Sequence, residues 1–257
     1  MTTIHPTAIV DPKAELAEDV AIGPYAVIGP HVSIGPATRV MSHVVIDGHT
    51  SIGARNEFFP MASIGQKTQD LKYAGGTCYL AIGDDNTFRE FVTVNTATTD
   101  GQATVVGSHN HIMAYCHIAH ECVIGDNVIM SNLATLAGHV IVEDYAVIGG
   151  MGGIHQFCRL GRMSMVGACT KINQDVVPCT VVEGNPAAPA GVNVVRMKRL
   201  GHTEDEVRAV KESYRLVYRQ QLKAREAVAA IREAYGDHAE ALHIAEFIQA
   251  SERGIVR

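Results

Sequence analysis

Apolar residues recur at every sixth position along most of the chain. The register starts at Ile4 and holds over residues 4–64, resumes over residues 82–94, and runs again over residues 106–172. An amphipathic helix would space its apolar residues by three or four positions, and a half-buried strand by two, so neither element explains the period. A sustained period of six is typical of a hexapeptide β-helix, in which each unit is a short strand followed by a turn.

The period predicts an all-β parallel β-helix over residues 1–190. Three units would close one triangular coil of about 18 residues, and the first residue of each unit would point inward, onto its equivalent about 4.8 Å away in the next coil. Each coil buries its apolar residues only against its neighbours, so a stable fold needs many coils. The two interruptions of the period predict loops extruded from the prism at 66–79 and 100–105.

The pattern becomes helical toward the C-terminus. Thr203, followed by Glu206 three residues later, is the signature of a capping box at a helix start, and two more helices are expected near 222–235 and 238–252. The sequence therefore predicts a C-terminal α-helical domain over residues 191–257.

This domain holds 12 Lys/Arg against 10 Asp/Glu, whereas the rest of the chain holds 9 against 17. A basic tail on an acidic protein suits an acidic partner, although a solvated helical surface would have the same composition.

Composition and charge narrow the class of protein. Hydrophobic residues make up 47 % of the 257 residues and charged residues 19 %, which is a globular composition. A net charge of -6 argues against nucleic acid as a partner. No apolar run reaches the roughly 18 residues that span a bilayer, so no transmembrane segment is expected, and the N-terminus has no pattern of a secretory signal. The six cysteines form no CxxC pair, so reduced thiols in the cytoplasm are expected rather than a disulfide framework.

Several of the 13 histidines fall together when the chain is wound at 18 residues per coil. His120 is the third residue of its unit, and the equivalent residue one coil later is Gly138. His117 lies at the corner that leads into the same face. The predicted column consists of His120, Gly138, His139, His155 and Gln156.

The pattern alone leaves three interpretations of this column open. The histidines can be ordinary polar residues near an edge. Their imidazoles can be ligands of a tetrahedral zinc-type site built from neighbouring coils or subunits. One of them can be a general base that takes a proton from a hydroxyl or an amine, while the N–H of Gly138 stabilises a carbonyl oxyanion.

Five stretches of the sequence resemble the UDP-N-acetylglucosamine acyltransferase family. These stretches read "QDLKYAG", "CHIAHEC", "NLATLAGHV", "IGGMGGIHQFCRLG" and "GVNVVRMKRLG". The similarity extends along essentially the whole chain, including the first loop and the helical tail. The "QDLKYAG" loop and the spacing from "LAGHV" to "HQFC" are more specific to this family than the repeat, which would also fit serine or sugar acetyltransferases and a later N-acyltransferase of the same pathway.

The resemblance implies a fold and a reaction. The coil would be left-handed. The enzyme would carry an (R)-3-hydroxyacyl chain from acyl carrier protein to the glucosamine 3-hydroxyl of UDP-GlcNAc, which is the first step of lipid A biosynthesis. The family works as a homotrimer with sites between neighbouring prisms and needs no metal or other cofactor. An activated thioester donor is consistent with this, because one base, one oxyanion donor and good positioning suffice and no catalytic cysteine is required.

The resemblance also assigns roles to single residues. His120 resembles the general base and Gly138 the oxyanion donor. The remaining assignments fall into three groups. Supporting histidines that position the sugar and the thioester are His117, His139 and His155. Residues of the first loop that hold the sugar nucleotide across the subunit boundary are Asp70 and Lys72. Residues that contact the nucleotide sugar or its phosphates are Gln156, Asn193 and Arg199.

Three departures from the family pattern put details of the acceptor in question. Glu121 follows the base where the family usually has Asp. Residues 93–98 read "TVNTAT" where the family has "TIHRGT", and Leu200 replaces a second arginine. The same chemistry on a 3-amino sugar nucleotide, which would give an amide, is therefore an alternative to transfer onto the hydroxyl.

Ala168 is the candidate residue for limiting the length of the acyl chain. It is the third residue of its unit and lies one coil past Gly150. By the resemblance it corresponds to the floor of the acyl site, and its size predicts an intermediate or shorter limit on chain length.

Two rival interpretations of the whole chain also stand. The main one is a related hexapeptide acyltransferase with another acceptor, and the second is a non-enzymatic scaffold with incidental histidines.

Overall fold

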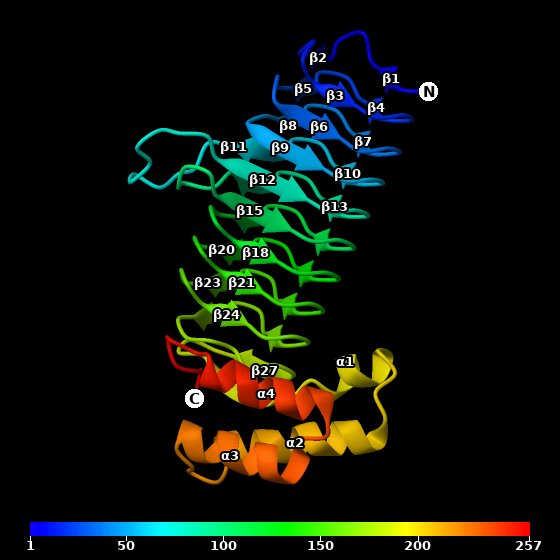
Figure 1. Cartoon of the computed structure of the whole chain (residues 1–257). Coiled ribbons are helices and arrows are strands. Elements are labelled where there is room, and N and C mark those ends of the chain that lie inside the picture. Colours follow the sequence, from blue (N-terminus) through cyan, green and yellow to red (C-terminus); the bar gives the residue numbers. More distant parts are fainter.

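The computed structural model describes all 257 residues and shows a stack of triangular coils capped by helices at its C-terminal end (Figure 1). Most six-residue units form a strand of two residues followed by a turn, and equivalent strands pair in parallel between successive coils. The first strands of the three sheets follow one another along the chain, so the coil visits sheet 1, sheet 2 and sheet 3 in turn. The fold is the expected left-handed parallel β-helix with a C-terminal helical domain.

Each sheet runs the length of the prism. Sheet 1 has 11 strands: β1 (Thr3–Ile4), β4 (Ala21–Ile22), β7 (Arg39–Val40), β10 (Glu57–Phe58), β13 (Thr87–Phe88), β16 (His111–Ile112), β19 (Ile129–Met130), β22 (Val147–Ile148), β25 (Met165–Val166), β27 (Thr180–Glu183) and the antiparallel β28 (Ala188–Val192). Sheet 2 has nine strands: β2 (Ile9–Val10), β5 (Val27–Ile28), β8 (Val45–Ile46), β11 (Ser63–Gln66), β14 (Thr93–Asn95), β17 (His117–Ile118), β20 (Thr135–Leu136), β23 (Gly153–Ile154) and β26 (Lys171–Ile172). Sheet 3 has eight strands: β3 (Glu15–Leu16), β6 (Val32–Ile34), β9 (His49–Ile52), β12 (Tyr79–Ile82), β15 (Ala103–Val106), β18 (Val123–Ile124), β21 (Ile141–Val142) and β24 (Arg159–Leu160).

The inward stack predicted from the period is the core of the prism. Ile118 pairs with Leu136, and Leu136 with Ile154, all of them buried. The rings of Phe58 and Phe88 stack at 5.0 Å between centroids. The period of six is therefore the spacing of residues that exclude water from the prism axis, which is the main stabilising term of such a solenoid.

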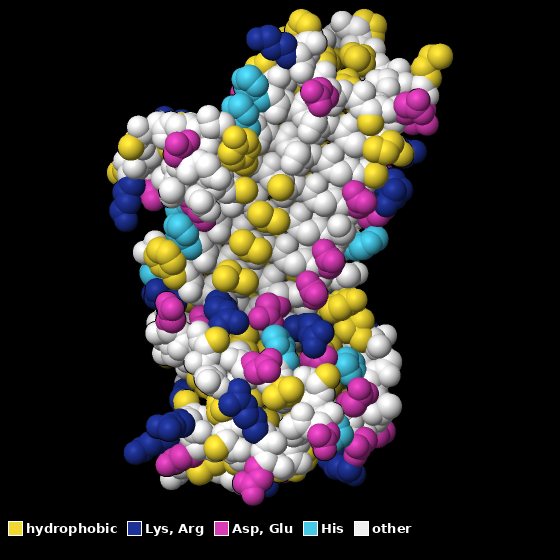
Figure 2. Space-filling view, in the orientation of Figure 1, with side chains coloured by type: hydrophobic (Ala, Val, Ile, Leu, Met, Phe, Trp, Pro, Cys, Tyr) yellow, Lys and Arg dark blue, Asp and Glu magenta, His cyan; other side chains and the backbone are white.

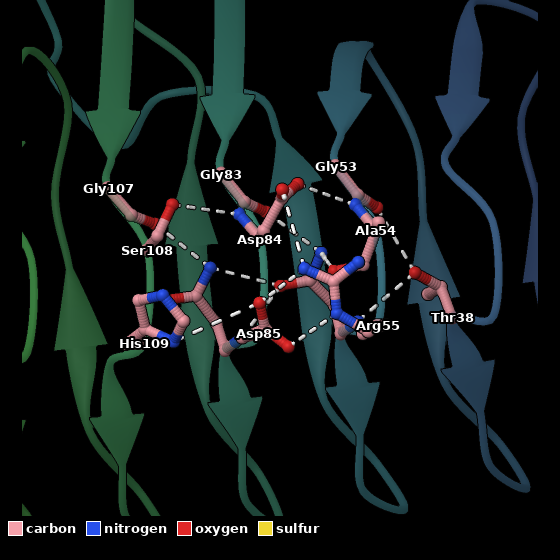
Figure 3. Close-up of polar contacts among 12 residues, drawn as sticks. Thr38, Gly53, Ala54, Arg55, Gly83, Asp84, Asp85, Gly107, Ser108 and His109 are labelled. Carbon is pink, nitrogen blue, oxygen red and sulfur yellow. Dashed lines mark hydrogen bonds and ion pairs between the residues drawn. The ribbon is translucent and has the colours of Figure 1, made fainter.

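Polar side chains link the coils at the corner between sheet 3 and sheet 1 (Figure 3). Asp84 Oδ1 accepts the Ala54 N–H at 2.7 Å, and the Asp84 N–H donates to Ser108 Oγ at 3.0 Å. Arg55 donates two hydrogen bonds to Asp85, at 2.7 and 2.6 Å. These contacts hold neighbouring coils in register. The residues involved are 30 and 24 positions apart instead of 18, because each of these coils also contains a loop that is extruded at another corner.

Both loops leave the prism at the corner between sheet 2 and sheet 3. The first loop connects β11 to β12 and projects from the side of the prism, as Figure 1 shows in cyan. The second connects β14 to β15. Because β15 begins at Ala103, this loop covers residues 96–102 and not the expected 100–105. The hydrophobic register resumes only at Val106, but sheet pairing already starts three residues earlier.

The tail is helical, as predicted. Its helices are α1 (Val194–Arg199), α2 (Glu204–Tyr218), α3 (Ala224–Tyr235) and α4 (Ala239–Gln249). The expected capping box is present: Thr203 Oγ1 accepts the Glu206 N–H, and the Glu206 carboxylate accepts the Thr203 N–H. The β28 strand continues past residue 190, so the helices begin only at Val194. None of the helices is long and apolar enough to cross a membrane.

Candidate active site

The predicted histidine column lies at the same corner as the two loops. His120 stands in the turn between β17 and β18, one coil after the second loop and two coils after the first. The His139 N–H donates to the His120 carbonyl, and the Phe157 N–H donates to the Gly138 carbonyl, so these turns stack directly on one another. The 18-residue map is therefore correct for this part of the column.

His120 is enclosed by two carboxylates. Its side chain is only 13 % exposed. Its Nδ1 is hydrogen-bonded to Glu121 Oε2, and its Nε2 lies 3.7 Å from Asp70 Oδ2. The contact with Asp70 is made within one chain, because the first loop folds back over its own corner. Asp70 therefore does not need a subunit boundary to reach this histidine.

Glu121 is fixed by the second loop. Its Oε1 accepts the N–H groups of Thr98 and Thr99, each at 2.8 Å, and its own N–H donates to Thr104 Oγ1 at 2.9 Å. Burial disfavours the charged carboxylate, but the hydrogen bonds from Thr99, from His120 and from Thr98 outweigh burial and hold the pKa of Glu121 below its ordinary value. One carboxylate oxygen is thus anchored on backbone, and the other faces the imidazole.

Gly138 lies directly against the imidazole of His120. A methyl group added at Gly138 would stand 2.3 Å from Cε1 and 2.5 Å from Nε2 of that ring, so the imidazole would have to move. The Gly138 N–H donates a hydrogen bond to no atom of the chain. The glycine therefore allows both the position of the histidine and an available N–H donor beside it.

His117 and His139 are neighbours of His120. His117 Nδ1 is hydrogen-bonded to Thr93 Oγ1 at 2.7 Å, and burial, with a smaller contribution from His120, lowers the pKa of His117. His117 is therefore neutral at pH 7. His139 meets the His120 ring edge-on at 5.3 Å between centroids and stacks on Phe157 at 4.6 Å.

A cavity of about 350 Å³ opens under the first loop and reaches His139. Asp70 and Lys72 both line it. The Lys72 N–H donates to Asp70 Oδ1 at 2.9 Å, whereas the Lys72 side chain is exposed. The two loop residues predicted to hold a sugar nucleotide, Asp70 and Lys72, therefore border one cavity that reaches His139, the neighbour of His120.

Other predicted residues are not gathered around His120. His155 and Gln156 occupy the next turn of the column and are exposed. Ala168 follows Gly150 by one coil as predicted, but at the corner between sheet 1 and sheet 2. The 18-residue register places His155, Gln156 and Ala168 on the same prism as His120, but they do not contact it.

Asn193 and Arg199 belong to a third corner. Asn193 caps α1 and donates to the Met163 carbonyl at 2.9 Å, and Arg196 of the same helix donates to the Asn127 carbonyl at 3.1 Å. Met163 and Asn127 lie between sheet 3 and sheet 1. Within one chain, α1 therefore lies on a different corner from His120.

The imidazole and carboxylate groups of the column would also suit a metal ion. His120, Glu121 and His139 each offer one ligand atom, and these atoms lie within 4.8 Å of one another.

A sulfur nucleophile is disfavoured, because burial raises the pKa of Cys122 to about 12 and that of Cys116 to about 11. Both thiols beside the histidines therefore stay protonated near neutrality.

Sequence reasoning missed the residues that position the histidines and Glu121. These are Thr93, Thr98, Thr99, Thr104 and Phe157. The second loop lengthens its coil from 18 to 24 residues, so Thr93 pairs with His117 across an irregular spacing. Phe157 could have been found, because it follows His139 by one regular coil.

Comparisons with known proteins agree with this architecture. Residues 175–256 match the family described as UDP N-acetylglucosamine O-acyltransferase, domain 2, and residues 103–138 match the bacterial transferase hexapeptide repeat. The chain is 49 % identical, over 100 % of both chains, to the acyl-[acyl-carrier-protein]–UDP-N-acetylglucosamine O-acyltransferase of Janthinobacterium sp. (strain Marseille).

Solved structures match over nearly the same extent. The UDP-N-acetylglucosamine O-acyltransferase of Moraxella catarrhalis is 41 % identical, with a TM-score of 0.96 over 99 % of both chains. The UDP-N-acetylglucosamine acyltransferase of Francisella novicida is 37 % identical, with a TM-score of 0.96 over 99 % of this chain and 94 % of that one. The similarity includes both the prism and the helical tail.

Proposed function

The chain belongs to the acyl-[acyl-carrier-protein]–UDP-N-acetylglucosamine O-acyltransferase family, and on this premise we propose that it catalyses the first step of lipid A biosynthesis with His120 as its general base. An (R)-3-hydroxyacyl chain passes from acyl carrier protein to the glucosamine 3-position of UDP-GlcNAc. The observation that carries the proposal is the arrangement around His120, which has an ionised carboxylate on Nδ1 and the free Gly138 N–H against its ring.

The carboxylate of Glu121 sets the tautomer of the base. An ionised carboxylate only accepts hydrogen bonds, so the proton of the pair resides on His120 Nδ1 and leaves Nε2 free to accept another. Nε2 takes the proton of the sugar 3-hydroxyl as its oxygen attacks the thioester carbonyl. Glu121, and Asp70 at 3.7 Å, then stabilise the imidazolium that forms.

The Gly138 N–H stabilises the oxyanion of the tetrahedral intermediate. Collapse of this intermediate breaks the carbon–sulfur bond and forms the ester, and His120 returns its proton to the departing thiolate. The donor is already activated, so this route uses no metal or other cofactor. Undiminished turnover after removal of metals by a chelator is the expected result, and loss of turnover that Zn²⁺ restores would favour a metal site on His120, Glu121 and His139.

The sugar nucleotide is assigned to the cavity beneath the first loop. Asp70 and Lys72 border this cavity and His139 closes it toward the base. A carboxylate and an ammonium suit the hydroxyls and the diphosphate of such a ligand. The "TVNTAT" segment supports the loop from below: Asn95 donates to the carbonyls of Gln66 and Lys67 at 3.3 and 3.1 Å.

A homotrimer would complete the site. Asn193 and Arg199, predicted to bind the nucleotide or its phosphates, lie on a different corner from His120, so they reach a base only across a subunit boundary. The corner between sheet 1 and sheet 2 offers an apolar contact surface. Its exposed residues are Met61, Phe91, Tyr115, Leu133 and Met151. Cyclic assembly would bury this row and bring two different corners together.

The same proposal implies that acyl carrier protein is the donor and that the enzyme works in the cytoplasm. The helical domain carries the excess of basic residues that an acidic carrier protein needs. Both substrates are soluble cytoplasmic molecules, and all six cysteines of the chain are free.

The reaction is tested by offering the purified enzyme a set of (R)-3-hydroxyacyl carrier proteins with UDP-GlcNAc or its 3-amino analogue. Mass spectrometry of the product reads the chain length and separates an ester from an amide. Transfer to the 3-hydroxyl is the expected result. Strict preference for the amine would establish the 3-amino sugar nucleotide as the acceptor, and no product on either sugar would contradict the proposed activity.

A further inference from the structure

The two extruded loops are hydrogen-bonded to each other through a pair of threonine hydroxyls. Thr68 of the first loop and Thr98 of the second share a hydrogen bond of 2.6 Å between their Oγ1 atoms. Figure 2 shows charged side chains on the projecting loop and histidine side chains at the edge of the prism below it. The threonine pair therefore joins the loops at the corner that holds the predicted base.

Thr68 sets the direction of the chain at Asp70. The Asp70 N–H donates to Thr68 Oγ1 at 3.1 Å, and the Lys72 N–H donates to Asp70 Oδ1 at 2.9 Å. These two turns leave Asp70 Oδ2 at 3.7 Å from His120 Nε2. The position of the Asp70 carboxylate beside the imidazole thus depends on where Thr68 is held.

The tip of the first loop has no other hydrogen bond to the rest of the chain. Residues 69–75 make hydrogen bonds only with one another, with Thr68 and with Gly76. Burial does not hold this segment either, since Leu71 is fully exposed. The two ends of the loop are anchored separately, by Asn95 at the Gln66 and Lys67 carbonyls and by Asp100 at the Thr77 N–H. Between these anchors, the threonine pair is the single hydrogen bond that fixes the loop.

Thr98 also reaches the base from its other side. Its N–H donates to Glu121 Oε1 at 2.8 Å, and Glu121 Oε2 is hydrogen-bonded to His120 Nδ1. One residue of the second loop therefore contacts the supports of both carboxylates. The contacts close a ring that consists of His120, Glu121, Thr98, Thr68 and Asp70.

Such a ring answers an electrostatic problem of this site. Two carboxylates beside one imidazole repel each other, and the repulsion is strong because both are shielded from water. The side chain of Glu121 is 10 % exposed and that of Asp70 24 %. Glu121 is held by two N–H groups, whereas Asp70 is held at His120 only through Thr68 and Thr98.

We infer that Thr98 is a positioning residue that holds the first loop and the base as one unit. Through Thr68 it keeps Asp70 at Nε2 of His120, and with its own N–H it keeps Glu121 at Nδ1. The inference rests on the proposed function. Thr98 also lines the cavity assigned to the sugar nucleotide, so an acceptor bound there meets a base whose two carboxylates are already in place.

The test is steady-state kinetics of Thr98→Val, which keeps the shape of the side chain and removes its hydroxyl. The N–H bond to Glu121 remains, but the first loop loses its tie. We expect kcat to fall about tenfold, the effect of losing one hydrogen bond while its partner stays buried. KM for UDP-GlcNAc should rise, because Asp70 and Lys72 become mobile, and KM for acyl carrier protein should not change. Thr98→Ser keeps the hydroxyl and should stay within about twofold of the wild-type kcat.

A double-mutant cycle shows whether Thr98 acts through Asp70. Asp70→Ala removes the carboxylate that the ring holds in place. In that background, Thr98→Val should lower kcat by less than about twofold, because effects on one coupled unit do not add. A general loss of stability would instead lower the activity by the same factor in both backgrounds.

Thr38→Val is the matched control. Thr38 is buried at the corner between sheet 3 and sheet 1, where its hydroxyl donates to the Gly53 carbonyl at 3.1 Å and accepts the Asn56 N–H at 3.2 Å. It therefore links neighbouring coils with a similar hydroxyl but far from the loops. Its kcat and both KM values should equal those of the wild type even where its Tm is lower.

Three outcomes overturn the inference. A wild-type kcat of Thr98→Val would show that the hydroxyl pair does not position the base. An equal loss in Thr98→Ser would show that the hydroxyl is not the group that matters, and an undiminished effect in the Asp70→Ala background would show that Thr98 does not act through Asp70. Absence of transfer by the wild type itself would instead contradict the proposed function, whatever the variants do.

Discussion

Replacing Glu121 by glutamine tests how the base is prepared. The two backbone N–H groups of Thr98 and Thr99 require an acceptor, so they fix the oxygen of the new amide toward the second loop. The amide NH₂ then faces His120 Nδ1, which must become an acceptor. The proton moves to Nε2, and the nitrogen that should receive the proton of the sugar hydroxyl is occupied.

The structure sets the size of this effect. Turning the amide around would restore the correct tautomer but would break two hydrogen bonds to partly exposed N–H groups, at a net of about 1 kcal/mol each. A difference of about 2 kcal/mol leaves roughly one molecule in 30 with a usable base. Loss of the charge that stabilises the imidazolium adds to this, and loss of the orienting carboxylate in a Ser-His-Asp triad lowers kcat by about 10⁴. We expect kcat to fall between about 30-fold and about 10⁴-fold.

The assay is single-turnover acyl transfer at saturating substrates, which removes effects on binding. Glu121→Asp, which keeps the charge but shortens the side chain, is expected to retain more activity than Glu121→Gln. Glu57→Gln on sheet 1 serves as the control for loss of an exposed carboxylate. Retention by Glu121→Gln of more than about a third of the wild-type rate, with an unchanged circular dichroism spectrum, would refute the role given to this carboxylate.

Four more perturbations probe the same corner and the acyl site. Gly138→Ala should displace the His120 ring, because its methyl group would stand 2.3 Å from Cε1, and should lower kcat far more than it changes KM for UDP-GlcNAc; a wild-type kcat would contradict this. The lowered pKa of Glu121 implies stabilisation that is present above the unfolded-state pKa of about 4.5 and is lost as pH falls through the lower folded-state pKa, so urea titrations should show the wild type's advantage over Glu121→Gln at pH 7 shrinking toward pH 3. Cys122, with a pKa of about 12, should resist alkylation at pH 8, and Cys122→Ser should remain active; inactivation coupled to its alkylation would revive a thiol mechanism. Ala168→Gly should extend the preferred acyl chain, and an unchanged preference would show that this residue is not the floor of the acyl site.

The period of six predicted the fold because it reflects a single physical requirement: the apolar residue that recurs every six positions must be buried against its equivalent in the next coil. Because the coils stack regularly, a residue 18 positions later lies one coil away, and this predicted that Gly138 and His139 lie beside His120. The same arithmetic placed Ala168 correctly after Gly150. In each case the backbone repeats, so sequence distance converts directly into position.

The arithmetic failed where the coils are not regular. The second loop ends at residue 102, before the register of buried residues resumes, because β15 starts pairing at Ala103. The contacts of Thr98 and Thr99 with Glu121 depend on the path of that loop, which no period describes. The position of Asn193 on a different corner depends on how the tail packs against the prism, and nothing in the repeat specifies it.

The most direct test of the account is the single-turnover rate of His120→Ala, compared with the wild type and with His5→Ala, a histidine at the first coil far from the loops. A general base contributes about 10²–10⁴-fold to the rate, so His120→Ala should lose at least a hundredfold while it binds UDP-GlcNAc with little change and His5→Ala stays at the wild-type rate. Transfer by His120→Ala within about tenfold of the wild type would mean that another group removes the proton of the acceptor, and the mechanism built on this corner would be wrong.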